Sequence, residues 1–228
     1  MATDPLATSD PAEFTARLAL ASADAAALGL DAVIVTPGTD MTYLCGYVAL
    51  PLERLTALII SPGESPKMVV PLLERPAAVA AGVEDLGIVV AAWEETEDPY
   101  GLVADLLPGA RRIAVNDAML ARAAFGLRDA MPQVSFELAG PVIGELRMRK
   151  TAAEVAALQE AGAAIDWVHA QVAGLLRPGV TEREVAARIA DRSWPRAGAR
   201  ETVVACSALA GPVGRLDLII GGTEDHDL

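Results

Sequence analysis

The side chains best suited to chemistry gather near the C-terminus. Asp217, Glu224, Asp225, His226 and Asp227 carry the oxygen and nitrogen donors that bind divalent metal ions. A metal site needs such donors held in place by rigid elements, whereas terminal segments are usually frayed. Adventitious metal binding is conceivable for these five residues, but we expect them to form a solvated acidic tail.

A second combination is Cys45 with His169, because a nucleophilic cysteine needs a nearby base to ionise near neutral pH. The predicted elements place the two residues in different domains. We therefore expect Cys45 to be a buried, inert thiol. His169 lies beside the apolar stripe of a long predicted helix, which favours a partly buried structural histidine. Cys206 is assigned no role.

Glycine-rich segments and tryptophans give no further site. Gly211–Gly214 lacks the Lys and Ser/Thr of a phosphate-binding loop, and Gly221–Gly222 begins no predicted helix. Trp93, Trp167 and Trp194 are widely spaced, so we expect them to pack rather than to stack on a ligand. No residue of this sequence is therefore predicted to be catalytic, to bind a cofactor or to bind a metal.

The composition excludes several classes of partner. The chain has 31 acidic and 18 basic residues, a net charge of -13, and lacks a Lys/Arg run that could follow a phosphate backbone, so nucleic acid is not expected. We see no uncharged apolar stretch of membrane-spanning length and no basic, apolar leader. Two cysteines are too few for a disulfide framework, which is typical of a reducing compartment. These features predict a cytoplasmic protein with no membrane contact.

The first part of the sequence alternates short apolar strands with helices, which is typical of an α/β sheet domain. Asp10 and Glu13 form a predicted capping box for a helix that runs to Leu28 and ends at Gly29. Beyond it, the pattern predicts strands at 32–36, 57–60, 67–70, 87–91 and 112–115, and helices near 73–81, 100–107 and 118–130. The strands at 57–60 and 67–70 flank a turn and predict a hairpin.

The composition changes at Gly140-Pro141, after which helices dominate. Thr151 with Glu154 forms a capping box for a long helix that ends at Pro178-Gly179, and Thr181 with Glu184 opens another that stops near Asp191. The long helix carries one apolar stripe made of Val155, Leu158, Ile165, Val168, Val172 and Leu175.

Three blocks of the sequence, in order, resemble the prolidase and creatinase family of metallopeptidases, the Xaa-Pro dipeptidases and aminopeptidases. Leu30–Tyr47 is similar to the family's strand-turn signature, with its Tyr-Leu-x-Gly-Tyr/Phe segment. Ile143–Val155 looks like the interdomain joint, where an LR-x-x-K sequence precedes the first catalytic-domain helix. Leu176–Ala186 is similar to the RPGVTE-x-E-VA turn that joins the first two helices of that domain.

The resemblance implies a creatinase-type N-terminal domain, a mixed sheet flanked by helices, followed by the opening helices of an α+β "pita-bread" catalytic domain. We expect a flexible N-terminus at 1–11, the α/β domain at 12–140, a joint at 141–150 and the start of the catalytic domain at 151–191. The match fails after Ala190. Residues 192–228 therefore form a divergent tail, for which a shifted reading frame is one hypothesis.

In this family two divalent metal ions, such as manganese or cobalt, are held by two Asp, one His and two Glu, and none of the five is matched here. The resemblance thus implies a truncated family member whose intact relatives hydrolyse Xaa-Pro bonds with metal-activated water, and which is itself inactive. The alternative is a non-catalytic binding module that forms a homodimer or pairs with full-length relatives. A third reading is a folded domain with no present function.

Overall fold

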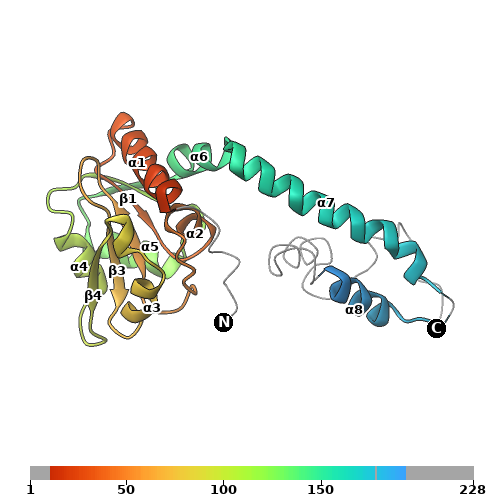
Figure 1. The fold of residues 1–228 in the computed structure, drawn as a ribbon. Helices are drawn as coiled ribbons and strands as arrows, with labels where there is room; N and C mark the ends of the chain where they lie inside the picture. Colours follow the sequence, from red (N-terminus) through yellow and green to blue (C-terminus); the bar gives the residue numbers. More distant parts are fainter. Residues whose placement is uncertain (1–10, 178, 194–228) are drawn as a thin grey trace. The chain divides into compact units, whose positions relative to one another are not determined.

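The structure is a computed structural model that describes residues 11–177 and 179–193. One six-stranded sheet dominates the first part of the chain, with the strands in the order β4-β3-β2-β1-β5-β6 (Figure 1). The strands are β1 (Ala32–Val35), β2 (Ala57–Ile60), β3 (Lys67–Pro71), β4 (Val89–Trp93), β5 (Arg112–Val115) and β6 (Ser135–Leu138).

The sheet is mixed, as the resemblance to the prolidase and creatinase family implies. β2 runs antiparallel to both of its neighbours, β1 and β3, so the predicted hairpin is confirmed. The β1–β5, β5–β6 and β3–β4 pairs are parallel. Ala32 of β1 is level with Ile113 of β5, although the two strands are far apart in sequence. The carboxyl ends of β1, β3, β4, β5 and β6 consequently meet at one edge of the sheet.

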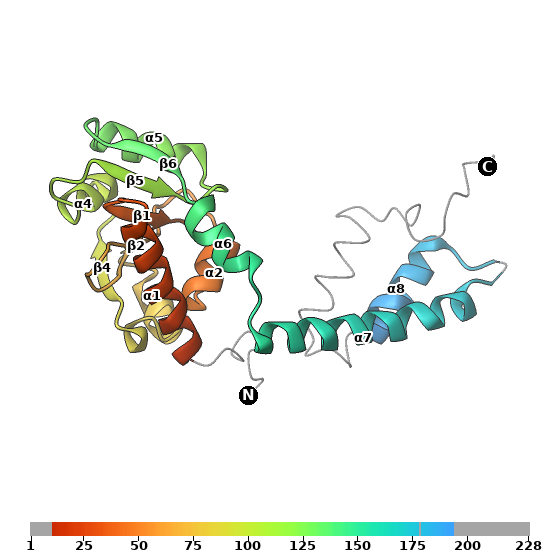
Figure 2. The same cartoon turned by 90° about the horizontal axis from the view of Figure 1, so that it is seen from above.

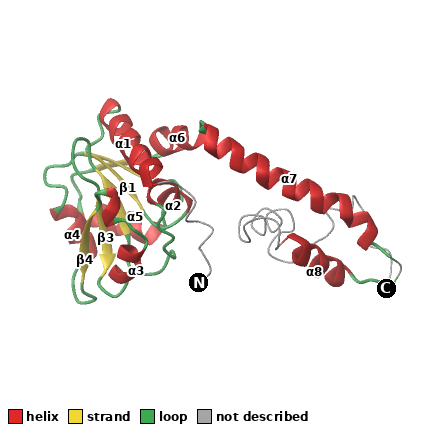
Figure 3. Cartoon of the chain, viewed as in Figure 1, coloured by secondary structure: helices red, strands yellow, loops and turns green. Residues whose placement is uncertain are grey.

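Helices cover both faces of this sheet, which explains why its central strands are continuous apolar runs. Figure 2 shows α1 and α2 on one side and α4 and α5 on the other, and Figure 3 shows the strands between them. Because side chains alternate along a strand, Val33 and Val35 join the core cluster under α1 and α2, while Ala32 and Ile34 join the one under α4 and α5. The helices around the sheet are α1 (Pro11–Ala27), α2 (Thr39–Cys45), α3 (Arg75–Ala80), α4 (Pro99–Asp105), α5 (Ala121–Ala130) and α6 (Glu145–Met148), with short turns η1 (Glu84–Leu86) and η2 (Gly140–Gly144).

A buried arginine ties α1 to α2. Arg17 is 8% exposed, and its guanidinium lies 4.1 Å from the ring centroid of Tyr43 and 5.4 Å from that of Phe14. It donates hydrogen bonds to the Tyr43 carbonyl at 2.9 Å and to the Glu13 carboxylate at 2.6 Å. Next to this stack, α2 ends at Gly46, whose φ of 72° is in the left-handed region.

Some elements differ from the sequence-based expectation. The segment that forms α2 is predicted from the sequence only as part of a strand and turn. The sequence does not predict β6, because Ser135–Leu138 has no apolar run and lies at an exposed edge of the sheet. β4 begins at Val89 rather than Gly87, because Gly87 has a φ of 76° and ends η1. The predicted helices near 73–81, 100–107 and 118–130 are confirmed as α3, α4 and α5 with trimmed ends.

The chain divides into two compact units between Arg149 and Lys150. We call them the sheet unit, described from residue 11 to 149, and the helical unit, described from residue 150 to 193. In the helical unit, both predicted capping boxes are present, at the start of α7 (Ala152–Leu175) and before α8 (Glu182–Ser193). Within the described chain, no helix combines the length and the apolar character that crossing a membrane requires.

The apolar stripe of α7 is exposed near the start of the helix and covered toward its end. Leu175 is buried against Val185 of α8, and Val168 is also buried. Val155 and Leu158, nearer the start of the helix, are 42% and 58% exposed. The described part of the helical unit thus holds only a small core at one end of α7.

Candidate functional site

A buried polar pair marks the place where the strand order of the sheet reverses. Thr36 follows β1 and Asn116 follows β5, and both residues are buried. The backbone N–H and the hydroxyl of Thr36 both donate to Asn116 Oδ1, at 3.0 and 3.1 Å. The Asn116 N–H donates to the carbonyl of Ile34 at 3.1 Å. Ligands of open α/β sheets bind outside the carboxyl ends of the strands at such a switch point.

A small hollow of about 30 Å³, open to solvent, lies beside this pair. Its walls come from the end of β1, the segment before β2, α4 and the start of α5. We call it the switch-point hollow. The polar and charged residues that line it are Thr36, Glu53, Arg54, Thr56, Tyr100 and Arg122. Its apolar lining includes Leu52, Leu55 and Leu120.

Tyr100 is held in the hollow by its own helix and by the neighbouring one. Asp98 caps α4, accepting a hydrogen bond from the Tyr100 N–H at 3.0 Å. The tyrosine ring lies against Gly126 of α5, so close that a Cβ at that position would be 2.4 Å from the ring carbon Cζ. Burial raises the pKa of Tyr100, an effect that Arg122 opposes and Asp98 reinforces. The hydroxyl therefore remains protonated, and able to donate, at neutral pH.

The two arginines of the hollow have different electrostatic surroundings. The Arg54 guanidinium lies 3.2 Å from the Glu95 carboxylate, 3.7 Å from that of Glu74 and 3.9 Å from that of Glu53. Arg122 makes one long hydrogen bond, at 3.5 Å, to the Glu53 carbonyl. Within the described residues Arg122 has no ion pair. Arg54 thus has three carboxylates within 4 Å of its guanidinium, whereas Arg122 contacts only a backbone carbonyl among the described residues.

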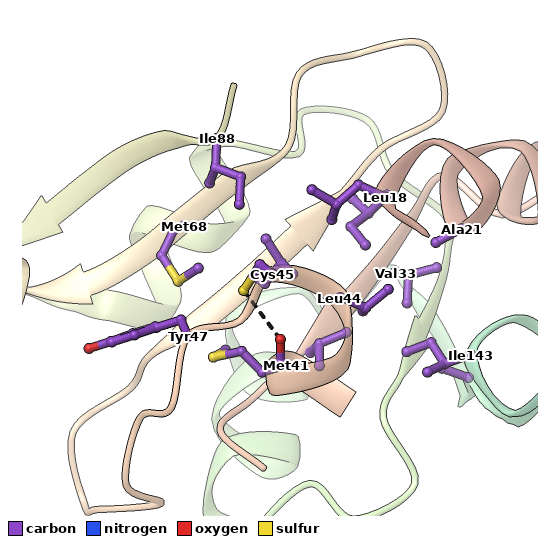
Figure 4. Packing of buried hydrophobic residues seen from close by; sticks show 14 of the residues in the cluster. Leu18, Ala21, Val33, Met41, Leu44, Cys45, Tyr47, Met68, Ile88 and Ile143 are labelled. Carbon is purple, nitrogen blue, oxygen red and sulfur yellow. Dashed lines mark hydrogen bonds between the residues drawn. The ribbon is translucent and has the colours of Figure 1, made fainter. Parts of the chain in front are cut away.

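Cys45 is the buried thiol that the sequence predicts. It is 1% exposed in the core beneath α1, where its Sγ donates to the Met41 carbonyl at 3.2 Å (Figure 4). Burial raises the pKa of the thiol to about 11 from its ordinary value of 9.0. Cys45 belongs to the sheet unit and His169 to the helical unit. His169 itself is exposed on α7, so the expectation of a partly buried histidine is wrong.

We predict that Cys45 is unreactive toward thiol reagents in the folded protein. In a Cys206→Ser background, iodoacetamide at pH 8 should label the native chain far more slowly than the urea-unfolded chain, because the native thiol is both inaccessible and protonated. Since the folded-state pKa is raised, the unfolded state loses its proton first, and stability should fall as pH rises from about 9 toward 11. Equal labelling rates in the two states would contradict this assignment.

Other predicted residues give no additional site in the described chain. Trp93 is 6% exposed and donates from Nε1 to the Leu55 carbonyl at 3.0 Å, which confirms a packing role. Among residues 11–177 and 179–193, no group of three or more His, Cys, Asp or Glu side chains could hold a metal ion. The acidic tail residues, Cys206, Trp194 and the two glycine segments named above lie outside the described residues.

Neither the residues of the switch-point hollow nor the Thr36–Asn116 pair beside it is singled out by the sequence analysis. A signal for the pair is present in the sequence, because Thr36 and Asn116 each come directly after a buried apolar strand. No comparable signal exists for Tyr100 and Gly126, which meet only because α4 packs against α5.

Comparison with known proteins places these features in a family. Residues 17–149 match the model of the creatinase/prolidase N-terminal domain. The chain is 44% identical over 183 residues to the probable dipeptidase PepE of Mycobacterium tuberculosis, covering 80% of this chain and 48% of that protein. It is 30% identical over 166 residues to the Xaa-Pro dipeptidase of Lactobacillus helveticus, covering 70% of this chain and 44% of that protein.

The fold agrees with a solved relative. The crystal structure of dipeptidase PepE from Mycobacterium ulcerans superposes with a TM-score of 0.77 at 44% sequence identity, covering 81% of this chain and 50% of that one. The chain thus spans about half the length of the relatives it matches. With its mixed six-stranded sheet and its match over residues 17–149, this chain belongs to the creatinase/prolidase N-terminal domain family.

Proposed function

We propose that this chain supplies the N-terminal half of an Xaa-Pro dipeptidase-type metallopeptidase, and that these 228 residues do not hydrolyse peptides by themselves. The observation that carries the proposal is the match of residues 17–149, nearly the whole sheet unit, to the creatinase/prolidase N-terminal domain. The relatives that extend this match are a probable dipeptidase and an Xaa-Pro dipeptidase. In such an enzyme, this half would support a catalytic domain that begins with α7 and α8.

The chemistry of the metal centre supports the second part of the proposal. Two divalent ions, such as manganese or cobalt, would polarise the peptide carbonyl and supply the attacking water. Holding and bridging two ions takes about five oxygen and nitrogen donor side chains. The described residues do not fit this requirement, because they bring no three ligand-type side chains together. No step of the reaction is therefore assigned to residues of this chain.

We expect the purified chain to give no turnover of Ala-Pro or Gly-Pro when manganese or cobalt is added. Proline release should stay at the level of a metal-only blank, measured alongside a full-length relative such as the dipeptidase PepE as the positive control. Robust cleavage by these 228 residues alone would overturn the proposal that the chain does not hydrolyse peptides by itself. Absence of cleavage by the relative would instead disqualify the assay conditions.

A second candidate function is a binding module that forms a homodimer or pairs with a full-length relative. Uncovered apolar residues favour it: Leu50 is 69% exposed, Leu73 is 72% exposed and Leu158 is 58% exposed. Light scattering after size-exclusion chromatography should give a mass above that of the 23.7 kDa chain. A strictly monomeric chain that also fails to bind the full-length relative would exclude this candidate.

A further inference from the structure

We propose that a groove at the carboxyl ends of β3 and β4 binds a basic, apolar peptide segment of a partner protein. We call it the β3–β4 groove. Its volume of about 570 Å³ lies within the range of about 300–1,000 Å³ that is usual for binding pockets. Its lining includes apolar residues and two carboxylates: Leu72, Leu73, Pro76, Trp93, Glu94 and Glu95. All of them lie in the sheet unit, so the proposal goes beyond the peptidase assignment and does not depend on it.

Hydrogen bonds and ion pairs hold the two walls of the β3–β4 groove in place. β3 and β4 are a parallel pair, so their carboxyl ends lie side by side (Figure 1). The Leu72 N–H donates to the Trp93 carbonyl at 2.8 Å, which joins the segment after β3 to the end of β4. The Arg54 guanidinium lies 3.7 Å from the Glu74 carboxylate on the first side and 3.2 Å from the Glu95 carboxylate on the second. The fold therefore fixes the spacing of the walls.

Exposed leucines suit part of the β3–β4 groove to an aliphatic side chain. Leu73 is 72% exposed and Leu72 is 45% exposed. Trp93 also lines the groove, and its indole is fixed by the hydrogen bond to the Leu55 carbonyl. Covering the two leucines with an aliphatic side chain removes apolar surface from water, which favours binding.

The charge of the β3–β4 groove selects a basic partner. Glu94 and Glu95 are exposed, and no Lys or Arg of the described chain is part of the lining. The Glu97 carboxylate accepts from the Glu94 N–H at 2.7 Å, which fixes the backbone of this turn. The Glu94 carboxylate itself makes no ion pair within residues 11–177 and 179–193, so it is available to a Lys or Arg of a ligand. A phosphate or an acidic peptide would be repelled.

A peptide of another protein fits these features better than a metal ion or a second copy of the chain. Among the described residues, no three His, Cys, Asp or Glu side chains come together to hold a metal. A second copy would bring a chain with a net charge of -13 against the carboxylates of the β3–β4 groove, and like charges oppose such a contact. A peptide in which leucine and arginine alternate can cover Leu73 and pair with Glu94 at the same time.

Titration with short peptides tests the proposal. The probe is acetyl-Leu-Arg-Leu-Arg-amide, added to the full chain and followed through the ¹H–¹⁵N resonance of the Trp93 indole, which Trp93→Phe identifies. This probe should shift the resonance saturably. Acetyl-Leu-Glu-Leu-Glu-amide lacks the positive charges and acetyl-Ser-Arg-Ser-Arg-amide lacks the aliphatic side chains, so each should bind at least about fivefold more weakly. No saturable shift with the probe, or equal binding of either control peptide, overturns the proposal.

Variants assign the binding to the β3–β4 groove. Glu94→Gln should weaken binding of the probe by about threefold, the loss of one exposed ion pair. Leu73→Ser should weaken it by about fivefold, because an aliphatic contact is lost. Leu50→Ser is the matched control, since Leu50 is 69% exposed but lies outside the groove, and it should bind the probe as wild type does. Unchanged affinity in both groove variants, with unchanged circular dichroism spectra, would remove the assignment.

Light scattering distinguishes binding of a partner from self-association through the same surface. Leu73→Ser should bind the probe more weakly without a change in the mass of the chain in solution. If wild type is instead oligomeric and Leu73→Ser is monomeric, the β3–β4 groove is an interface between copies and the proposal is wrong.

Discussion

Replacing Gly46 by alanine should lower the free energy of unfolding by about 2–4 kcal/mol. Two costs add at this position. Gly46 has a φ of 72°, a conformation that L-residues other than glycine adopt only with strain. A Cβ would also lie 2.9 Å from Cζ of Phe14, whose ring packs with the Arg17 guanidinium. Urea unfolding followed by tryptophan fluorescence gives the comparison with wild type.

The control for this substitution is Gly63→Ala. Gly63 has nearly the same φ, 75°, but nothing lies within 4 Å of a Cβ built on it. This variant should lose only the backbone cost, about 1–2 kcal/mol, so the difference between the two variants isolates the collision with Phe14. If both variants lose the same stability, the Phe14 ring has room to move away from residue 46, and the contact between α1 and α2 is loose.

Asn116→Ala should cost about 2–4 kcal/mol, because it leaves buried polar groups without partners. Asn116 Oδ1 accepts from both the backbone N–H and the hydroxyl of Thr36. The backbone N–H cannot be removed by mutation and becomes an unsatisfied donor at the end of β1. Thermal unfolding monitored by circular dichroism measures the loss.

Thr36→Val separates the two hydrogen bonds. It removes the hydroxyl but keeps the backbone N–H on Asn116, so the expected loss is about 1 kcal/mol. Asn116→Ala should therefore lower the free energy of unfolding clearly more than Thr36→Val does. A larger effect from Thr36→Val would mean that side-chain packing, and not satisfaction of the backbone donor, determines stability at this edge.

The sequence predicts the buried part of this fold well. The predicted ends of three buried strands agree with the structure to within one residue: Ala32–Val35, Ala57–Ile60 and Arg112–Val115. A short run of apolar, β-branched residues favours a buried strand, which is why its position can be predicted from the sequence. The edge strand β6 escaped prediction for the opposite reason. Phe136 is the only apolar side chain of β6 that is even partly buried, so the sequence of β6 contains no apolar run that would predict a strand.

The Thr36–Asn116 pair beside the switch-point hollow could be predicted only in part. The sequence shows a polar residue, Thr36 or Asn116, directly after the apolar run of β1 or β5. Their pairing depends on β1 lying beside β5, which no local pattern encodes. The slot that Gly126 provides for Tyr100 depends on helix packing in the same way. Local sequence patterns thus predict individual helices and strands, whereas the position of a site depends on which strands and helices lie side by side.

The parallel pairing of β1 with β5 also bears on how the protein emerges from the ribosome. β1, β2 and β3 can associate as soon as residue 71 has left the exit tunnel, but one edge of β1 must wait for Arg112–Val115 to be made. At ordinary elongation rates this delay lasts roughly several seconds. During that time a fully apolar strand presents unsatisfied amides to its surroundings, so nascent chains stalled within this window are the ones we expect chaperones to recognise.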